Sequence, residues 1–184
     1  MTALGFRLHT GWAVLVAVSD DYKVYLRRRV ELLNNTVPRF MYHAAAEMPL
    51  ADAQALIQQA EAIALEHAHQ AIADAVKKIP VVACGVAIGS AKLPSDLATI
   101  LRSHALIHAG EGALFQKAVI GAAERQGLRV TATREKGLWT GLDPALQKRI
   151  EGMRSEFGPP WTMDHKIATA VALAALTPPR QTPQ

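Results

Sequence analysis

A predicted strand hairpin, followed by alternating strands and helices, constrains the fold of this chain more than any other feature. Strands are predicted at Phe6–Val18 and Tyr22–Leu33, and the turn signal Ser19–Asp20–Asp21 separates them. So short a link favours an antiparallel hairpin. For Arg27–Leu33, the alternatives are a third short strand or a bend.

The remainder of the chain alternates long helical patterns with short apolar runs. Phe40–Glu47 fits neither pattern, and the predicted elements after it are a helix at Leu50–Lys78, a buried strand at Ile79–Ile88, a helix from Ser95–Asp96 to Gln126, a strand at Leu128–Thr133, a helix starting at Asp143–Pro144 and a helix at Thr162–Leu176. This order predicts an α/β fold: a mixed sheet with an N-terminal antiparallel hairpin and helices on both faces.

Length and composition predict an ordinary globular chain. The 184 residues suffice for one domain at 1–176, and the proline-rich segment 177–184 is predicted to be a loose tail. Half of the residues are apolar and 20% are charged, which excludes intrinsic disorder as the class. The single cysteine, Cys84, excludes an internal disulfide and is expected to be a small buried hydrophobe.

The N-terminal segment is better explained as a strand than as a targeting segment. The apolar run Trp12–Val18 after Arg7 is at the short limit for a signal peptide, and a second strand follows directly. No stretch is long enough to cross a membrane. We therefore expect a soluble, cytoplasmic protein with no membrane partner.

The charge of the chain is compatible with a nucleic-acid partner. The net charge is +4 and the isoelectric point is about 9.4. The one basic cluster is Arg27–Arg28–Arg29, in which strand alternation puts Arg27 and Arg29 on one face and Arg28 on the other. The favoured interpretation of the cluster is a solvated sheet edge.

A cluster of polar side chains on the predicted helix that ends at Gln126 is the strongest candidate site. His104, His108 and Glu111 fall on the apolar stripe of this helix, where the pattern predicts burial. Buried polar groups need partners, a ligand or a cleft, because burying them unpaired costs several kcal/mol. Two histidines four residues apart share one helical face, so these three residues are a candidate site for a divalent metal.

Two interpretations of this cluster remain open. In the first, His104, His108 and Glu111 are catalytic and line a pocket, together with Asp164 as a catalytic residue and with His9, Tyr42 and His43 in the lining. In the second, they are hydrogen-bonded structural residues, and Asp164 merely stabilises the positive end of the last helix. The zinc-protease motif is absent, since Ala105, Leu106 and Ile107 separate the two histidines.

Two segments and the order of elements resemble a known family. Leu8–Leu15 (LHTGWAVL) resembles a first strand that leads into a Gly-Thr/Ser-Gly-Trp-like turn. Asp164–Ala174 (DHKIATAVALA) resembles a last helix in which an Asp precedes small residues packed on the sheet. Together with the element order, these segments resemble the ribonuclease H-like fold, in particular its Holliday-junction resolvase branch.

The resemblance implies a carboxylate metal site, from which this sequence departs. Nucleases of the family place carboxylates on the first strand, near the end of the fourth strand and on the last helix, to hold the divalent metals that cleave phosphodiesters. Here the first strand offers His9, the strand at Ile79–Ile88 offers no acid, and only Asp164 matches. The resemblance therefore predicts a degenerate nuclease site.

Three functional hypotheses follow. The favoured one is a ribonuclease H-like protein with a degenerate nuclease site that binds a ligand or nucleic acid. The first alternative is a metal-assisted hydrolase that uses the His/Glu cluster. The second is a structural module that forms a homo-oligomer through its long alanine-rich helix.

Overall fold

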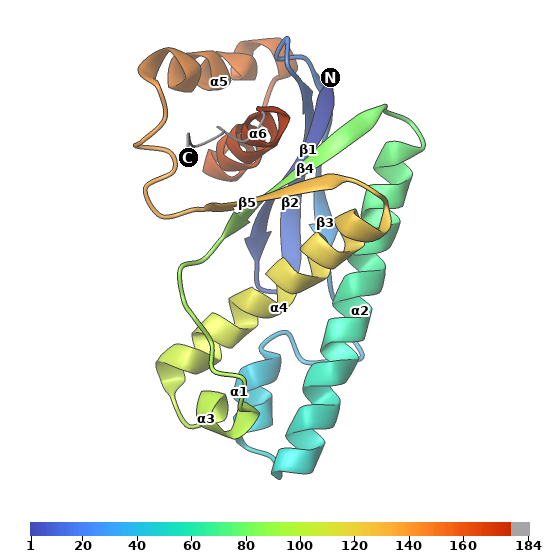
Figure 1. Ribbon diagram of the computed structural model, residues 1–184, viewed down its shortest axis with the longest axis vertical. Helices are drawn as coiled ribbons and strands as arrows, with labels where there is room; N and C mark the ends of the chain where they lie inside the picture. The colour runs from blue at the N-terminus through green and yellow to red at the C-terminus, as the bar shows by residue number, and fades with distance from the viewer. Residues whose placement is uncertain (178–184) are drawn as a thin grey trace, which may run out of the picture.

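The computed structural model describes residues 1–177, which form a five-stranded mixed sheet with helices on both faces (Figure 1). The strands are β1 Thr2–His9, β2 Trp12–Ser19, β3 Val24–Glu31, β4 Val81–Ile88 and β5 Arg129–Arg134. The helices are α1 Met41–Ala46, α2 Leu50–Val76, α3 Leu97–Leu101, α4 His104–Arg125, α5 Pro144–Phe157 and α6 Met163–Leu176. The predicted α/β fold with an antiparallel N-terminal hairpin is confirmed.

The sheet has the order β3-β2-β1-β4-β5. β1 pairs with β2, and β2 with β3, in the antiparallel direction, whereas β1, β4 and β5 run parallel to one another. Parallel strands end at the same edge of a sheet, so His9, Ile88 and Arg134 mark one edge. Residues that immediately follow these strands, such as Glu135, are brought to that edge as well.

Successive β1 side chains point to opposite faces of the sheet and pack into two separate cores. Leu4 and Phe6 are fully buried in the larger core, against α2 and α4. Ala3 points to the opposite face and joins the core formed by α5 and α6. Figure 1 shows the same layering, with α6 on one side of the sheet and α2 and α4 on the other.

The prediction of one strand over Phe6–Val18 is wrong. The segment contains a tight turn at Thr10–Gly11, and Gly11 has a φ of +83°, a conformation that favours glycine. His9 and Trp12 pair directly across this turn. The apolar runs of the two strands nearly adjoin in the sequence and so imitate one long strand. The turn predicted at Ser19–Asp20–Asp21 is confirmed by the hydrogen bond from Tyr22 N to Ser19 O.

The predicted helix from Ser95 to Gln126 is two helices. Asp96 caps α3 by accepting a hydrogen bond from Thr99 N at 2.9 Å. After a break, Ser103 caps α4 and leaves His104 as its first residue. His104 and His108 lie on the same face of α4 as Glu111, but they belong to its first turns, which lie beside α1 and α3 and away from the sheet (Figure 1). Both are therefore exposed rather than buried as predicted.

The other helical and strand predictions agree with the structure to within a few residues, and α1 forms in the unassigned region 40–47. The alanine stripe of α2 packs inside the chain, in the core shared with α4. Burial raises the pKa of the Cys84 thiol to about 12, as suits a small core residue. The predicted tail at 177–184 lies outside the described residues except for Thr177, which ends α6. Over residues 1–177, no helix is both long enough and apolar enough to span a bilayer.

Candidate functional site

Two glycines bring the last helix directly onto the sheet. A Cβ atom on Gly5 would lie 1.8 Å from the carbonyl oxygen of Ala168, and one on Gly85 would lie 1.9 Å from that of Val171. Gly5 and Gly85 are paired neighbours on β1 and β4. Their lack of side chains therefore lets the α6 backbone rest on both strands. One turn before Ala168, this contact places Asp164 over the end of β1.

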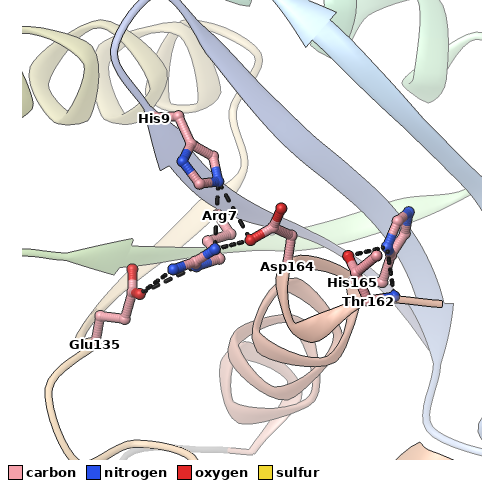
Figure 2. A network of polar contacts seen from close by, with 6 residues as sticks. All are labelled: Arg7, His9, Glu135, Thr162, Asp164 and His165. Atoms are coloured by element: carbon pink, nitrogen blue, oxygen red, sulfur yellow. Dashed lines mark hydrogen bonds and ion pairs between the residues drawn. The ribbon is translucent and has the colours of Figure 1, made fainter. Parts of the chain in front are cut away.

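Arg7 lies where Asp164 meets the sheet, and it forms the centre of a polar network (Figure 2). Its Nη1 forms an ion pair with Asp164 Oδ1. Its Nε and Nη2 donate to Glu135 Oε1 at 3.0 and 2.8 Å. His9, two residues along β1 and so on the same face, places Nε2 3.2 Å from Asp164 Oδ1 and 3.3 Å from Arg7 Nη1. One guanidinium thus bridges two carboxylates.

The network is partly open to solvent. Arg7 and Asp164 each keep 22% of their side-chain surface exposed, and Glu135 keeps 34%. Burial and the neighbouring Arg7 charge lower the pKa of His9, so its imidazole is neutral at pH 7. The charges of the network are then one cation against two anions.

These residues do not fit the divalent metal that the resemblance implies. A nuclease metal site needs several carboxylate oxygens that converge on an empty point. Here the guanidinium of Arg7 lies between Asp164 and Glu135, and a cation entering there would have to displace it. The equivalent position on β4 is Ala87, which packs with Ile167 and Val171 of α6 and provides no ligand.

Basic and aromatic side chains surround the β1–β2 turn beside this network. His9 stacks on Trp12 with ring centroids 4.0 Å apart. The Arg29 guanidinium lies 3.9 Å from the centroid of the Trp12 ring and forms an ion pair with Glu31. Arg39 is exposed and donates from Nε to Thr10 O at 3.0 Å. The structure thus gathers cationic groups and an aromatic ring at the sheet edge next to Asp164.

The start of α6 is fixed by a reciprocal cap that leaves Asp164 available for Arg7. His165 Nδ1 accepts from Thr162 N at 3.2 Å, and Thr162 Oγ1 lies 2.9 Å from the same nitrogen (Figure 2). Burial and the Arg27 charge lower the pKa of His165, which keeps this nitrogen an acceptor. Asp164 lies in the first turn of α6, where a carboxylate interacts favourably with the positive end of the helix dipole.

A second polar cluster lies where α1 packs against the start of α4. One ring nitrogen from each of His43, His104 and His108 lies within 4.8 Å of the others. Glu111, only 2% exposed, accepts from Tyr42 N at 2.9 Å and lies 3.3 Å from His43 Nδ1. Burial raises the pKa of Glu111, and it raises that of the Tyr42 hydroxyl to about 12.

The residues predicted to share one pocket therefore divide into two groups. His9 and Asp164 belong to the network around Arg7, whereas Tyr42, His43, His104, His108 and Glu111 form the second cluster. In Figure 1, α1 and the start of α4 lie well away from α6. A single catalytic pocket made from both groups is excluded by this separation.

The sequence reading missed Arg7 and Glu135, although each left a signal. Arg7 lies two residues before His9, so strand alternation places both on the face that meets Asp164. Glu135 directly follows the last parallel strand, at the edge where the first strand ends.

The fold is shared with a resolvase of known structure. The chain matches no model of a known protein family and no curated protein sequence. It is similar to RuvC from Thermus thermophilus in complex with a Holliday junction substrate, with a TM-score of 0.56 and 16% identity over 94% of this chain and 90% of that chain. A second structure of Thermus thermophilus RuvC gives a TM-score of 0.55 and 16% identity over 94% and 92% of the two chains.

The likeness confirms the predicted fold. The chain has the ribonuclease H-like fold and resembles the Holliday-junction resolvase branch in structure as well as in element order. At 16% identity the likeness carries the fold alone, and the activity has to be argued from the side chains at the site.

Proposed function

We propose that this chain is a nucleic-acid-binding protein of the ribonuclease H-like fold that does not cleave its ligand. The observation that carries the proposal is the position of Arg7, whose guanidinium contacts Asp164 and Glu135 at the edge where nuclease carboxylates would hold metal. One internal cation bridges these two carboxylates and offsets part of their charge, in place of a metal ion. The site is then a structural relic of a nuclease centre.

The argument against cleavage rests on the residues present. Phosphodiester hydrolysis by metal ions needs a cation that activates water and stabilises the leaving oxygen. A guanidinium supplies charge and hydrogen bonds, but it cannot lower the pKa of a bound water as a metal does. His9 is held against Arg7 and Asp164, and the acid that β4 would contribute is absent.

The argument for binding rests on charge and on the fold. The net charge is +4, and Arg29 and Arg39 lie at the β1–β2 turn beside the network. Basic side chains supply most of the free energy of nucleic-acid binding because phosphates release counterions when they meet them. The structural neighbour is described as bound to a Holliday junction, so a branched duplex is the first ligand to test.

Binding and cleavage should be measured on the same labelled DNA. Fluorescence anisotropy of a four-way junction and of a duplex with the same sequence, each with and without Mg²⁺, measures affinity, and denaturing gels of the same samples measure cleavage. We expect the junction to bind, with an affinity that falls as salt rises, and to remain intact in Mg²⁺.

Each part of the proposal can fail separately. Mg²⁺-dependent cleavage that Asp164→Asn abolishes would overturn the claim that the site is inactive. An affinity for DNA and RNA that is no tighter than that of an acidic control polymer such as heparin, and that is insensitive to Arg39→Gln, would overturn the claim of nucleic-acid binding.

A further inference from the structure

The cluster formed by His43, His104 and His108 lies outside the network around Arg7 and has no part in the function proposed above. We propose that these three histidines bind one divalent transition-metal ion, with Zn²⁺ as the favoured ion. Imidazole nitrogens suit Zn²⁺, Ni²⁺ and Cu²⁺, whereas Mg²⁺ and Ca²⁺ prefer oxygen ligands.

The geometry of the rings supports a shared ligand. The rings of His43 and His104 are 5.8 Å apart, those of His43 and His108 are 4.8 Å apart, and those of His104 and His108 are 4.5 Å apart. The planes of the three pairs cross at 82°, 67° and 89°, so the rings converge edge to face and do not stack. Tetrahedral zinc with Zn–N bonds of about 2.1 Å needs nitrogens roughly 3.4 Å apart. Small side-chain rotations bring ring nitrogens that already lie within 4.8 Å to that spacing.

The elements that carry the histidines are fixed by the surrounding fold. Ser103 caps α4 directly before His104, and His108 follows one turn later on the same face. Gly110 lets the ring of Tyr42 pack against α4, since a Cβ there would lie 2.8 Å from the Tyr42 ring. Tyr42 is the neighbour of His43 on α1, so this contact holds the third histidine close to the other two.

Glu111 provides an independent sign of a metal site. Its buried carboxylate lies 3.3 Å from His43 Nδ1, and its second oxygen has no hydrogen-bond partner among the described residues. Metal-binding histidines commonly donate their other ring nitrogen to a carboxylate, which fixes the ring and raises its basicity. His43 would then bind the metal through Nε2, and Glu111 acts as a positioning residue and not as a ligand.

The fourth coordination position faces solvent. His104 and His108 are exposed, and His43 is half-buried. Three protein ligands with one open position are typical of zinc sites that bind water or an exchangeable ligand, whereas structural zinc sites usually have four protein ligands. The site thus differs from the sequence-based metal prediction in one ligand, because His43 takes the place that Glu111 had there.

Zinc binding should be measured on the untagged full-length chain by competition with a fluorescent chelator. We expect one Zn²⁺ per chain, retained in excess Mg²⁺, and an affinity at least 100-fold weaker in the double variant His104→Gln/His108→Gln. The matched control is His67→Gln/His69→Gln on α2, where the side chains contact Glu31 O and Gln126 instead, and it should leave the affinity unchanged. Because His104 and His108 are exposed, their replacement should not alter the circular dichroism of the chain.

Glu111→Gln tests the positioning role separately. It should weaken Zn²⁺ binding by about 10- to 100-fold while leaving a site of the same coordination, seen as unchanged visible bands of the Co²⁺-loaded protein. Equal Zn²⁺ affinity in the wild type and the double histidine variant would overturn the proposal, as would equal losses in the double variant and the α2 control. A Co²⁺ spectrum of the weak octahedral type would overturn the three-histidine tetrahedral geometry.

Discussion

Gly5 and the backbone of α6 leave no room for a side chain, so Gly5→Ala should displace the helix. The added Cβ would lie 1.8 Å from Ala168 O and 2.8 Å from Ala172 Cβ, whereas real Cβ contacts essentially never fall below 3.0 Å. The obstacle is backbone in a fully buried layer, so no rotamer change relieves it, and α6 must retreat by more than 1 Å. Overpacking a core commonly costs about 1–3 kcal/mol. We expect the upper end, about 3 kcal/mol, because a whole helix loses contact with β1 and β4.

Urea unfolding followed by circular dichroism measures this loss. For a chain of this size, about 3 kcal/mol corresponds to a fall in Tm of roughly 6–12 °C. The matched control is Gly152→Ala on α5, where an added Cβ meets nothing within 4 Å. That change should be neutral or stabilise the chain by up to about 1 kcal/mol, since alanine is the better helix former. A Gly5→Ala variant within about 0.5 kcal/mol of the wild type would refute the close packing of α6 that positions Asp164.

Three further predictions follow from other contacts. Arg39→Gln should weaken binding to all nucleic acids alike and reduce the slope of log affinity against log salt by about one. The control Lys77→Gln, which lies just before β4 at the opposite edge of the sheet, should change neither. Fluorescence anisotropy at several salt concentrations measures both variants. His165 has a lowered pKa in the folded chain, so the unfolded chain binds the extra proton, and stability should fall as pH drops below about 6.5 and stay level above it. His165→Gln should reduce this pH dependence of the free energy of unfolding by at most about 1.4 kcal/mol per pH unit. If urea unfolding shows that variant and wild type lose the same free energy of unfolding between pH 7.5 and 5.5, the prediction is contradicted. Arg27→Lys should cost about 1–2 kcal/mol, because Arg27 donates to the carbonyls of residues 157–160, whereas Arg154→Lys, at an exposed position, should cost less than about 0.5 kcal/mol in the same assay.

The order of elements was predictable because it depends on periodicity and turn chemistry. The buried strand before Ile88 and the cap at Asp143 are local signals, and both appear in the structure. The apolar pattern missed the turn at Thr10–Gly11, which only the family resemblance indicated, because two apolar strands adjoin it and a single glycine marks it. The alternation of Arg27, Arg28 and Arg29 was also predictable, and Arg28 donates to Ala71 on α2 while its neighbours face the other side.

The chemistry of the site could be predicted only in part, because it depends on which side chains meet across long sequence distances. Asp164 carried a local signal at the start of a helix. Its partnership with Arg7 depends on how closely α6 approaches the sheet, and that distance is set by Gly5 and Gly85. In a sequence, such glycines resemble any small residue in a strand.

The histidine cluster shows the same limit. His104 and His108 are four residues apart and were recognisable as a pair. His43 lies on a short helix that periodicity did not assign, so its approach to the pair was not predictable from spacing. The expected burial of His104 and His108 failed because a new helix begins at His104, and its first turns lie away from the sheet that covers the later residues of the same face.

The measurement that tests the central claim most directly is Mn²⁺ binding by the wild type and by Arg7→Asp. Both proteins should also carry His104→Gln/His108→Gln, so that any Mn²⁺ bound reports on the network around Arg7 and not on the histidine cluster. The decrease of the free Mn²⁺ signal in electron paramagnetic resonance measures the binding. We expect no Mn²⁺ binding by the protein that retains Arg7. We expect a new Mn²⁺ site in the Arg7→Asp protein, because a third carboxylate then stands between Asp164 and Glu135 in place of the guanidinium. Equal Mn²⁺ binding by both proteins, abolished in each by Asp164→Asn, would contradict the claim that Arg7 occupies the place of the metal.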